Sequence, residues 1–416
     1  MRFPEFSGEW EICKVSELLD FYSTNSLSWE QLEYGEKAMM NLHYGLIHVG
    51  LPTMVDLRRD KLPNVKEGNM PKNFELCKEG DVAFADASED TNEVAKVIEL
   101  FNLDNKDIVC GLHTIHGRDN KNKTIVGFKG YAFSSSAFHN QIRRIAQGTK
   151  IYSISTKNFS ECYVGIPSKA EQTKIATLLR LIDERIATQN KIIEDLKKLK
   201  SAIVETLFCT PKESMPAKRV STYSKEWKLI KLSDICQRVQ TKNTGNQCRQ
   251  VLTIAAQHGL VNQEDFFNKT VASENLEGYY LLQKGDFAYN KSYSGDYTWG
   301  AIKRLERYDK GVLSPLYICF RPDLSKVDAD FLAHYFESKK WYKGVADIAG
   351  EGARNHGLLN ISVIDFFNTT HRIPNLDEQK RIAKILNSLS LKLSCEQRIM
   401  QSLMMQRNYL LRNMFI

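Results

Sequence analysis

Three groups of side chains in this sequence resemble catalytic or ligand-binding motifs, but each group lacks a residue that its motif requires. Residues 285–292 nearly match a phosphate-binding loop, but Asn290 stands where the second glycine of that loop is required. A similar stretch earlier in the chain, residues 80–87, has neither the lysine nor the serine that would hold a phosphate and its metal ion. Nucleotide binding is therefore not expected.

The other two groups consist of acidic and imidazole side chains. Asp365, Glu378 and Lys380 imitate the acidic cluster of a nuclease, but Glu378 also stands where it would help to cap a helix. His113 and His116 could be two ligands of a metal ion, yet no cysteine or carboxylate is spaced to complete the set, which favours histidines of the core or of a loop. Cofactor-loop and serine-hydrolase motifs are absent. We therefore expect no catalytic residue, no metal site and no cofactor in this chain.

Length and charge narrow the class of protein. With 416 residues the chain is long enough for two or more domains, and 42% hydrophobic content is typical of a folded protein. The net charge of +7 is concentrated in residues 197–231 and 380–416, which suits either a polyanionic partner or solvated helix faces. The nine scattered cysteines, and the lack of a secretory or membrane-spanning stretch, favour buried thiols and a cytoplasmic location.

The sequence also predicts a long helix, and this helix occurs twice. Residues 168–209 and 375–416 are offset by 207 positions, and each follows an Ile-Pro pair that ends the preceding segment. Apolar residues recur at alternating steps of three and four, which predicts a coiled-coil seam. The predicted seam is Ile175, Leu179, Ile182, Ile186, Gln189, Ile193, Leu196, Lys200, Ile203 and Leu207 in the first copy, and Ile382, Leu386, Leu389, Leu393, Glu396, Met400, Leu403, Arg407, Leu410 and Met414 in the second.

A helix of this length with an apolar seam needs a partner, and the other copy is the nearest one. Ser168 and Asn375 each stand three residues before a glutamate, which is the spacing of a helix cap. Antiparallel pairing would place the globular parts at opposite ends of a rod, and parallel pairing would place them side by side. Polar residues in the seam, such as Gln189 and Glu396, are expected to fix the register of the pair.

The repeat extends into the globular parts, although most of their sequence has diverged. Residues 9–18 match residues 226–235, and the Gly-Asp turn at residues 80–81 matches the turn at residues 285–286. Both parts mix predicted strands with helices, so we assign them to the α+β class. The predicted order is a globular domain over residues 1–167, a long helix over 168–209, a linker over 210–225, a second globular domain over 226–374 and a second long helix over 375–416.

Within the globular domains, periodicity predicts individual strands and helices. The predicted strands are residues 107–115, 124–133, 297–305 and 311–320, and the predicted helices are residues 138–146 and 331–345.

Two divergent globular domains, alternating with two similar helices that begin IPxxxEQ, resemble the specificity subunit of a type I restriction–modification enzyme. The helix motifs are Ile166-Pro167 with Glu171-Gln172, and Ile373-Pro374 with Glu378-Gln379. The domain openings at residues 2–10 and 226–227, and the turns at residues 148–150 and 352–354, also resemble this family. The resemblance covers essentially the whole chain, although residues 222–225 lack the RFPEF run that opens the first domain.

The resemblance implies that each globular domain is a target-recognition domain that reads one half of a split, asymmetric DNA sequence. The two helices would form an antiparallel coiled coil that spaces the half-sites. Two modification subunits would bring S-adenosylmethionine and methylate adenine, and restriction subunits would use ATP and Mg²⁺ for translocation and cleavage. The chain itself would be a non-catalytic subunit of that complex.

DNA contacts within such domains are expected from loop residues that suit phosphates or base edges. The candidates are Arg118, Arg143, Arg144 and Lys150 in the first half, and Asn290, Lys291, Ser292, Tyr293, Arg354, Asn355 and His356 in the second. The alternative for each is a surface charge or local turn chemistry. The alternative for the whole chain is a coiled-coil scaffold that bridges two protein partners without reading DNA.

Overall fold

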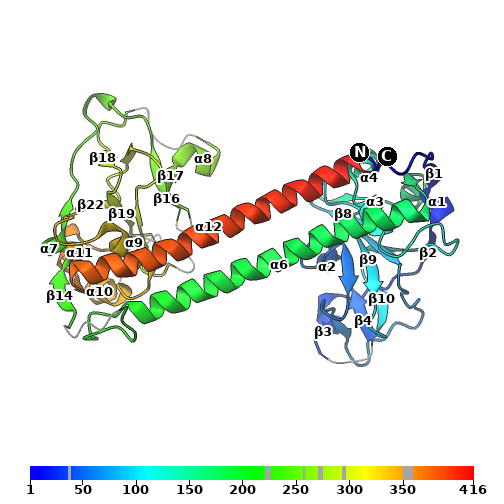
Figure 1. The fold of residues 1–416 in the computed structure, drawn as a ribbon, viewed down its shortest axis with the longest axis horizontal. Helices are drawn as coiled ribbons and strands as arrows, with labels where there is room; N and C mark the ends of the chain where they lie inside the picture. Colours follow the sequence, from blue (N-terminus) through cyan, green and yellow to red (C-terminus); the bar gives the residue numbers. More distant parts are fainter. Residues whose placement is uncertain (36–38, 221–225, 256–257, 270–274, 293–296, 350–358) are drawn as a thin grey trace. The chain divides into compact units, whose positions relative to one another are not determined.

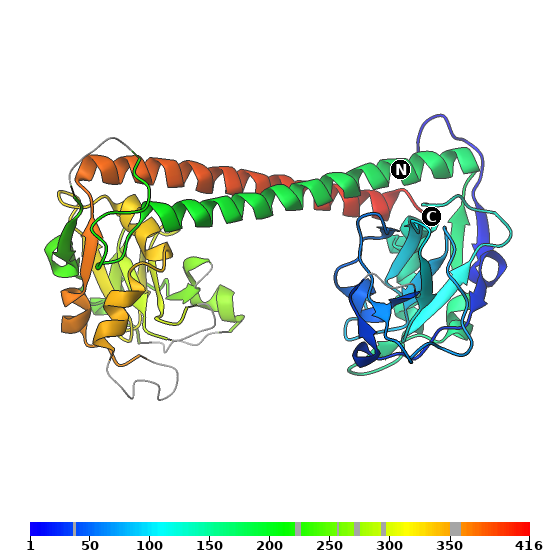
Figure 2. The ribbon, with the colours of Figure 1, turned by 90° about the horizontal axis from the view of Figure 1, so that it is seen from below.

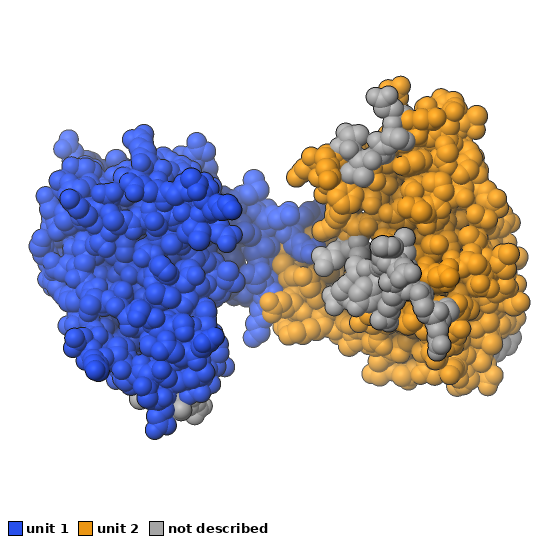
Figure 3. Space-filling model, turned by 180° about the vertical axis from the view of Figure 1, so that it is seen from behind, with its two compact units in different colours: residues 1–191, 397–416 blue, residues 192–396 orange. Residues whose placement is uncertain are grey.

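The computed structural model describes residues 1–416 apart from residues 36–38, 221–225, 256–257, 270–274, 293–296 and 350–358. The chain divides into two compact units, one of residues 1–191 with 397–416 and the other of residues 192–396 (Figure 3). Each unit combines short strands and helices with parts of two long helices, which confirms the α+β class. No helix within the described residues has the length and apolar character to cross a membrane.

The described part of the first unit contains a five-stranded and a four-stranded sheet. The five-stranded sheet has the order β2 (Asp20–Tyr22), β11 (Thr114–Arg118), β7 (Val82–Ala85), β9 (Val97–Asn102) and β5 (Met54–Asp56). The four-stranded sheet has the order β10 (Asp107–Cys110), β4 (Met39–Leu42), β6 (Asn64–Val65) and β3 (Leu32–Glu33). Two-stranded pairs join β1 (Glu11–Lys14) to β13 (Tyr163–Ile166) and β8 (Ala87–Ser88) to β12 (Tyr152–Ser153).

Short helices complete this unit and close its core. They are α1 (Val15–Leu18), a 3₁₀ turn at Trp29–Gln31, α2 (Tyr44–His48), α3 (Lys129–Phe133), α4 (Ser136–Ile145) and α5 (Thr156–Ser160). Aromatic side chains such as Phe84, Phe133 and Phe138 are fully buried, and their rings meet edge to face.

In the described residues of the second unit, the strands form a four-stranded sheet and three two-stranded sheets. The sheet has the order β15 (Cys236–Arg238), β22 (Ile318–Pro322), β19 (Phe287–Asn290) and β20 (Ala301–Arg304). The pairs are β14 (Lys228–Lys231) with β23 (Thr370–Ile373), β16 (Leu252–Ala255) with β17 (Gly259–Asn262), and β18 (Tyr280–Gln283) with β21 (Lys310–Leu313). The short helices are α7 (Leu232–Ile235), a 3₁₀ turn at Thr244–Asn246, α8 (Gln263–Phe267), α9 (Ala329–Glu337), α10 (Tyr342–Ile348) and α11 (Val363–Asn368).

The two units share a strand register although their sequences differ. In β7 and β11, Ala83 faces His116, and in β19 and β22, Ala288 faces Cys319. Leu76 bridges to Val109 in the first unit as Leu281 pairs with Val312 in the second. Cys13 faces Val164 as Ile230 faces His371. Positions in one half can therefore be matched to positions in the other.

The two long helices are α6 (Lys169–Leu207) and α12 (Leu376–Asn413), and neither is interrupted (Figures 1 and 2). In the first unit, Leu179 near the start of α6 belongs to the same core cluster as Leu410 near the end of α12. In the second unit, Val204 near the end of α6 shares a core cluster with Leu386 near the start of α12. The helices therefore pair antiparallel, which was one of the two arrangements that the seam allowed.

The structure buries or half-buries every predicted seam position of both helices. Two polar residues of the seam, one in each helix, contact the globular part of their own unit. Lys200 Nζ lies 3.2 Å from Glu337 Oε2, and Arg407 donates to Thr53 Oγ1 at 2.9 Å. Arg407 also pairs with Asp183 of α6 at 2.5 Å. These residues interrupt the apolar pattern because they attach the seam to the domain beside it.

Several predicted strands are wrong in extent or type. Residues 107–115 form two strands, because a turn that includes His113, with φ 54°, separates β10 from β11. Residues 311–320 are likewise divided between β21 and β22, and only Ala301–Arg304 of residues 297–305 is a strand. The predicted helix over residues 138–146 is confirmed as α4, whereas residues 331–345 form two helices, α9 and α10.

Residues 124–133 were predicted as a strand, but they form a turn followed by α3. Gly127 has φ 94°, which extended backbone does not allow. The buried carboxylate of Glu99 accepts hydrogen bonds from the backbone N–H groups of Gly127 and Gly130, both at 2.8 Å. A distant side chain thus satisfies this turn, and no local pattern could have indicated it.

Candidate nucleic-acid interface

An arginine–glutamate pair anchors the start of each long helix to its globular part. Arg2 donates two hydrogen bonds to the carboxylate of Glu171, at 2.7 and 2.6 Å, and Arg219 does the same to Glu378, at 3.0 and 2.5 Å. Both glutamates are buried, so each charge is neutralised by a bidentate partner. Arg219 lies within the predicted linker, residues 210–225, but it matches Arg2 and belongs to the packed second half.

The glutamine after each of these glutamates completes the anchor. Gln172 accepts a hydrogen bond from the backbone of Ile125 at 2.9 Å, and Gln379 accepts one from the backbone of Asp328 at 2.8 Å. Both amides also donate to the carbonyl of the proline that precedes the helix, at 2.9 Å. The IPxxxEQ motif therefore fixes the direction in which each globular part leaves its helix.

The loop of the second half that was predicted to contact DNA follows β19. Asn290, Lys291 and Ser292 are half-exposed, and Asn290 Oδ1 accepts a hydrogen bond from the backbone of Ser292 at 3.0 Å. The carbonyl of Lys291 accepts from the backbone of Leu359 at 2.9 Å, which places this loop beside residues 359–361. Four further candidates, Tyr293, Arg354, Asn355 and His356, lie outside the described residues.

Three of the first-half candidates lie on the surface around the end of α4. Arg143, Arg144 and Lys150 are exposed. Arg143 donates to Asn92 Oδ1 at 3.0 Å and also contacts Asn140. Cations in the last turn of a helix are favoured by its dipole, so Arg143 and Arg144 also have a local structural role.

The fourth candidate, Arg118, lies in the interior. Its guanidinium donates to both oxygens of Asp81 at 2.9 and 2.8 Å, to Glu75 at 2.6 Å and to the carbonyl of Leu76 at 2.7 Å. It also stacks over the ring of Tyr22, with 4.4 Å between the guanidinium carbon and the ring centroid. The hydrogen bonds to Asp81 raise the pKa of Arg118 above its usual value. All of these contacts are internal, so Arg118 serves the core and is not presented to DNA.

The structure also gathers aromatic and imidazole side chains that sequence reasoning missed. The Trp29 and His43 rings are 4.5 Å apart, and Tyr44 lies 4.7 Å from His43, 5.9 Å from His48 and 5.3 Å from His113. We call these five residues the aromatic–histidine surface of the first half, in which Trp29 and His113 are exposed, Tyr44 and His48 are half-buried, and His43 is buried. Its signal in the sequence was the density of aromatic and histidine residues between positions 29 and 48.

Short local contacts position this surface. His43 Nδ1 caps α2 by accepting from the backbone of Gly45 at 3.1 Å, and His113 Nδ1 lies 3.1 Å from Asp86 Oδ1. Burial lowers the pKa of His43, so its ring is neutral at pH 7. Trp29 keeps 46% of its surface exposed. Exposed π faces can stack on bases, and imidazole nitrogens can donate to or accept from base edges.

The two long helices also expose apolar side chains outside the seam. Large apolar side chains are exposed on both of them although the seam is covered. They are Leu181, Ile192 and Leu199 on α6, and Ile385, Leu391, Ile399, Met404, Met405 and Tyr409 on α12. Exposed apolar residues on a helix can bind another protein where they form a contiguous patch.

Comparison with known proteins finds similarity to one family in sequence, and a shared fold among solved structures. Residues 60–198 match the type I restriction modification DNA specificity domain. The specificity subunit of the type I restriction enzyme MjaVIII of Methanocaldococcus jannaschii is 24% identical over 268 residues, which are 58% of this chain and 59% of that protein. The match thus spans less than two thirds of the relative's length.

Two solved structures share the fold over nearly the full length of both chains. The S subunit of a type I restriction–modification system from M. genitalium has a TM-score of 0.58 at 17% identity, covering 100% of this chain and 99% of that one. A chain from a study of complex assembly and conformational transition of the type I R-M system has a TM-score of 0.56 at 13% identity, covering 98% and 99%.

Proposed function

Because this chain belongs to the family of type I restriction–modification DNA specificity subunits, we propose that it recognises a bipartite, asymmetric DNA sequence for such a complex. The observation that carries this proposal is the duplication itself. Two globular halves share a strand register and the same anchor on a long helix, yet differ in the side chains they expose. Two globular halves that share one duplicated fold but expose different side chains suit the recognition of two different half-sites.

Each half contributes its own contacts in this proposal. The aromatic–histidine surface and the basic residues near the end of α4 read the first half-site, and the loop Asn290–Ser292 reads the second. Lysine and arginine hold phosphates, whereas amide, imidazole and aromatic groups face the bases. The paired helices set the distance between the half-sites.

The chain takes no part in the chemistry of the complex. Modification subunits dock on the exposed apolar residues of α6 and α12 and bring S-adenosylmethionine. Restriction subunits add the steps that depend on ATP and Mg²⁺, and the assembly works in the cytoplasm. The same exposed residues also suit the alternative of a scaffold that bridges two proteins without reading DNA, so the test must separate the two functions.

Methylome sequencing of a host with and without this chain, in the presence of its modification subunit, provides that test. We expect adenine methylation at one split motif that disappears when the chain is deleted. In gel-shift titrations, the complex of chain and modification subunit should bind that motif with an affinity that falls steeply with salt, because bound phosphates release counterions. A methylome that does not change, with salt-insensitive protein association, would establish the scaffold instead.

A further inference from the structure

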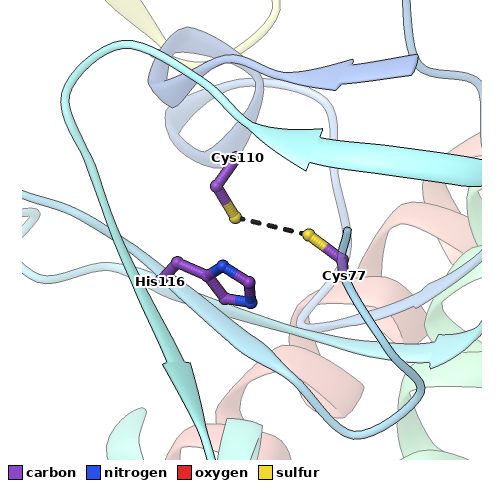
Figure 4. Close-up of side chains that lie close together, drawn as sticks. All are labelled: Cys77, Cys110 and His116. Carbon is purple, nitrogen blue, oxygen red and sulfur yellow. Dashed lines mark hydrogen bonds between the residues drawn. The ribbon is translucent and has the colours of Figure 1, made fainter. Parts of the chain in front are cut away.

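Two cysteines and a histidine converge inside the first half. The Sγ atoms of Cys77 and Cys110 are 3.6 Å apart, and the imidazole of His116 faces both thiols (Figure 4). One ligand atom from each residue lies within 4.8 Å of the other two, and all three residues are buried. We call them the thiol–imidazole cluster. Spacing along the chain did not indicate a cysteine partner for His116, and the fold brings both cysteines to it.

The hydrogen bonds of His116 leave one ring nitrogen available to a ligand. Its Nε2 atom lies 2.7 Å from Oδ2 of Asp81, whereas its Nδ1 atom is buried without a hydrogen-bond partner in the described part of the chain. A histidine that binds a metal ion typically donates its other N–H to a carboxylate, which fixes the tautomer and the ring orientation. Asp81 holds His116 in this way and leaves Nδ1 as an acceptor.

The three residues come from separate segments of the domain. Cys110 ends β10 in the four-stranded sheet, and His116 lies in β11 of the five-stranded sheet. Cys77 precedes β7, and its backbone N–H donates to the carbonyl of Ile108 at 2.9 Å. An ion held by all three would therefore link the two sheets of the first half.

The second half provides an internal comparison for these positions. His116 corresponds to Cys319 by strand register, and the cysteines correspond to leucines: Leu282 stands for Cys77 and Leu313 for Cys110. The two leucines are 0% exposed and belong to one apolar core cluster with Cys319. The second half therefore fills these three positions with two leucines and one cysteine, which is not a set of metal ligands.

At these positions the first half buries a polar group without a hydrogen bond, and the second half does not. A buried imidazole nitrogen without a hydrogen bond is unfavourable, because it has lost its contact with water and gained no partner. Two thiols and an imidazole together at three core positions are also the ligand types that zinc prefers. A bound ion would occupy the free nitrogen and both sulfur atoms at once.

We propose that the thiol–imidazole cluster binds zinc, through Sγ of Cys77, Sγ of Cys110 and Nδ1 of His116. In a tetrahedral site with Zn–S bonds of about 2.3 Å the two sulfurs lie roughly 3.8 Å apart, which is close to the 3.6 Å observed. Three protein ligands leave the fourth position to water or another small ligand.

The charges of the filled site balance. Two thiols lose their protons to solvent as the ion binds, and the two thiolates neutralise the charge of Zn²⁺. The carboxylate of Asp81 is already neutralised by Arg118, at 2.9 and 2.8 Å. A buried site without net charge avoids the large desolvation cost of an unpaired ion. The site stabilises the first half, and this inference does not depend on DNA recognition.

Metal analysis of the full chain tests this site directly. The protein is purified without chelator from cells supplied with zinc, and metal content is measured by mass spectrometry. We expect about one zinc per chain, a loss of that zinc in Cys77→Ala and His116→Ala, and its retention in Cys319→Ala, the matched cysteine of the second half. Replacing zinc with Co²⁺ in the unchanged chain should give sulfur-to-cobalt charge-transfer absorption, which needs no variant to fold.

Two results would overturn the proposal. One is a folded chain that carries less than about a tenth of a zinc per molecule and shows no thiolate absorption with Co²⁺, whether Cys77 and Cys110 are free thiols or a disulfide. The other is zinc that remains in both Cys77→Ala and His116→Ala. Zinc that a chelator removes from the unchanged chain, with a fall in Tm that added zinc reverses, would support the site.

Discussion

At the scale of single residues, several charged side chains of this chain serve its interior and not its surface. Arg118 has the residue type of a DNA contact, yet its guanidinium is enclosed by Asp81, Glu75 and Tyr22. Its hydrogen bonds and those of His116 outweigh burial, and so hold the pKa of Asp81 below its usual value. Residue type alone thus does not distinguish a reader of DNA from a member of the core, because burial decides the role.

His371 should make the stability of the second half depend on pH. Its ring is buried between Tyr335 and Thr369, at 3.0 and 2.9 Å, and burial lowers its pKa from 6.5 to about 4. Between these pH values the unfolded chain binds the additional proton, so stability falls as pH drops from about 6.5 to about 4, by up to about 3 kcal/mol. Urea unfolding measured across this range checks the prediction.

The control for His371 comes from the first half, where Val164 occupies the matching position. His371→Val should flatten the decline of stability between pH 6.5 and pH 4, whatever it costs at neutral pH through lost hydrogen bonds. His258→Gln, at an exposed histidine, should leave the decline unchanged. An unaltered pH profile in His371→Val would refute the assignment.

Trp29 should contribute to DNA affinity through its exposed face. Its ring lies 4.5 Å from that of His43 and keeps 46% of its surface exposed. Stacking on a base contributes about 1–3 kcal/mol, so Trp29→Ala should weaken binding of the target roughly 10- to 100-fold. Gel-shift titration of the complex with its modification subunit measures this loss. Tyr163→Ala, at an aromatic residue 45% exposed on β13, should have little effect, and equal losses in both variants would argue against a specific contact.

At the scale of elements, the helix starts show how local and tertiary signals cooperate. Ser168 Oγ accepts from the backbone of Glu171 at 3.3 Å, and Asn375 Oδ1 accepts from that of Glu378 at 3.0 Å, as the cap spacing predicted. The glutamate carboxylates do not complete a capping box, because they bind arginines from the domain openings instead. One short motif thus both starts a helix and attaches a domain to it.

Arg219→Ala should destabilise the second half by about 3 kcal/mol, because it leaves the buried carboxylate of Glu378 without its partner. The side chain of Glu378 is only 1% exposed and that of Arg219 is 14% exposed. Arg219→Lys should recover only part of the loss, since an ammonium cannot form the bidentate pair. Denaturant unfolding followed by a probe in the second half measures the effect.

The matched control is the exposed pair Lys343–Asp347, with side chains 48% and 55% exposed. Lys343→Ala should cost less than about 1 kcal/mol. If Arg219→Ala costs no more than this control, the arginine–glutamate anchor is not what secures the start of α12.

At the scale of the whole molecule, antiparallel helices join two halves that repeat one frame. Thr53, from the first globular part, contacts Arg407 of α12, and Glu337, from the second, contacts Lys200 of α6. Each globular part is therefore attached to both helices, at the start of one and near the end of the other. Such double attachment fixes each globular part on the helix segments of its own unit.

Half-site spacing should follow helix length. Inserting seven residues into α6 and seven at the matching level of α12 keeps the seam in phase and lengthens each helix by about 10 Å. At about 3.4 Å per base pair, we expect the methylated motif to gain about three base pairs between its halves, with the half-sites unchanged. Methylome sequencing reads the result.

An insertion of the same length between Ser214 and Met215, outside both helices, is the control and should leave the spacing as it was. A motif that keeps its spacing when both helices are lengthened would show that the helices do not measure this distance.

Long periodic patterns predicted the secondary structure of this chain more accurately than short patterns did. The seams over residues 168–209 and 375–416 correspond to α6 and α12 within a few residues, since many slots of one period leave little ambiguity. The strand over residues 124–133 was wrong because Glu99, remote in the sequence, stabilises a turn there. The predicted linker missed Arg219 because its partner Glu378 lies 159 residues away.

The sequence by itself determined the duplication, the two long helices and their apolar seams, because these are written in the order and period of residues along the chain. The seam left the direction of pairing open, and the antiparallel arrangement that the family resemblance implied is confirmed. Tertiary structure alone decided the burial of Arg118, the aromatic–histidine surface and the meeting of Cys77 with Cys110 and His116. Those features depend on which distant segments become neighbours. Such neighbours are set by the packing of the entire core and leave no period or motif in the chain.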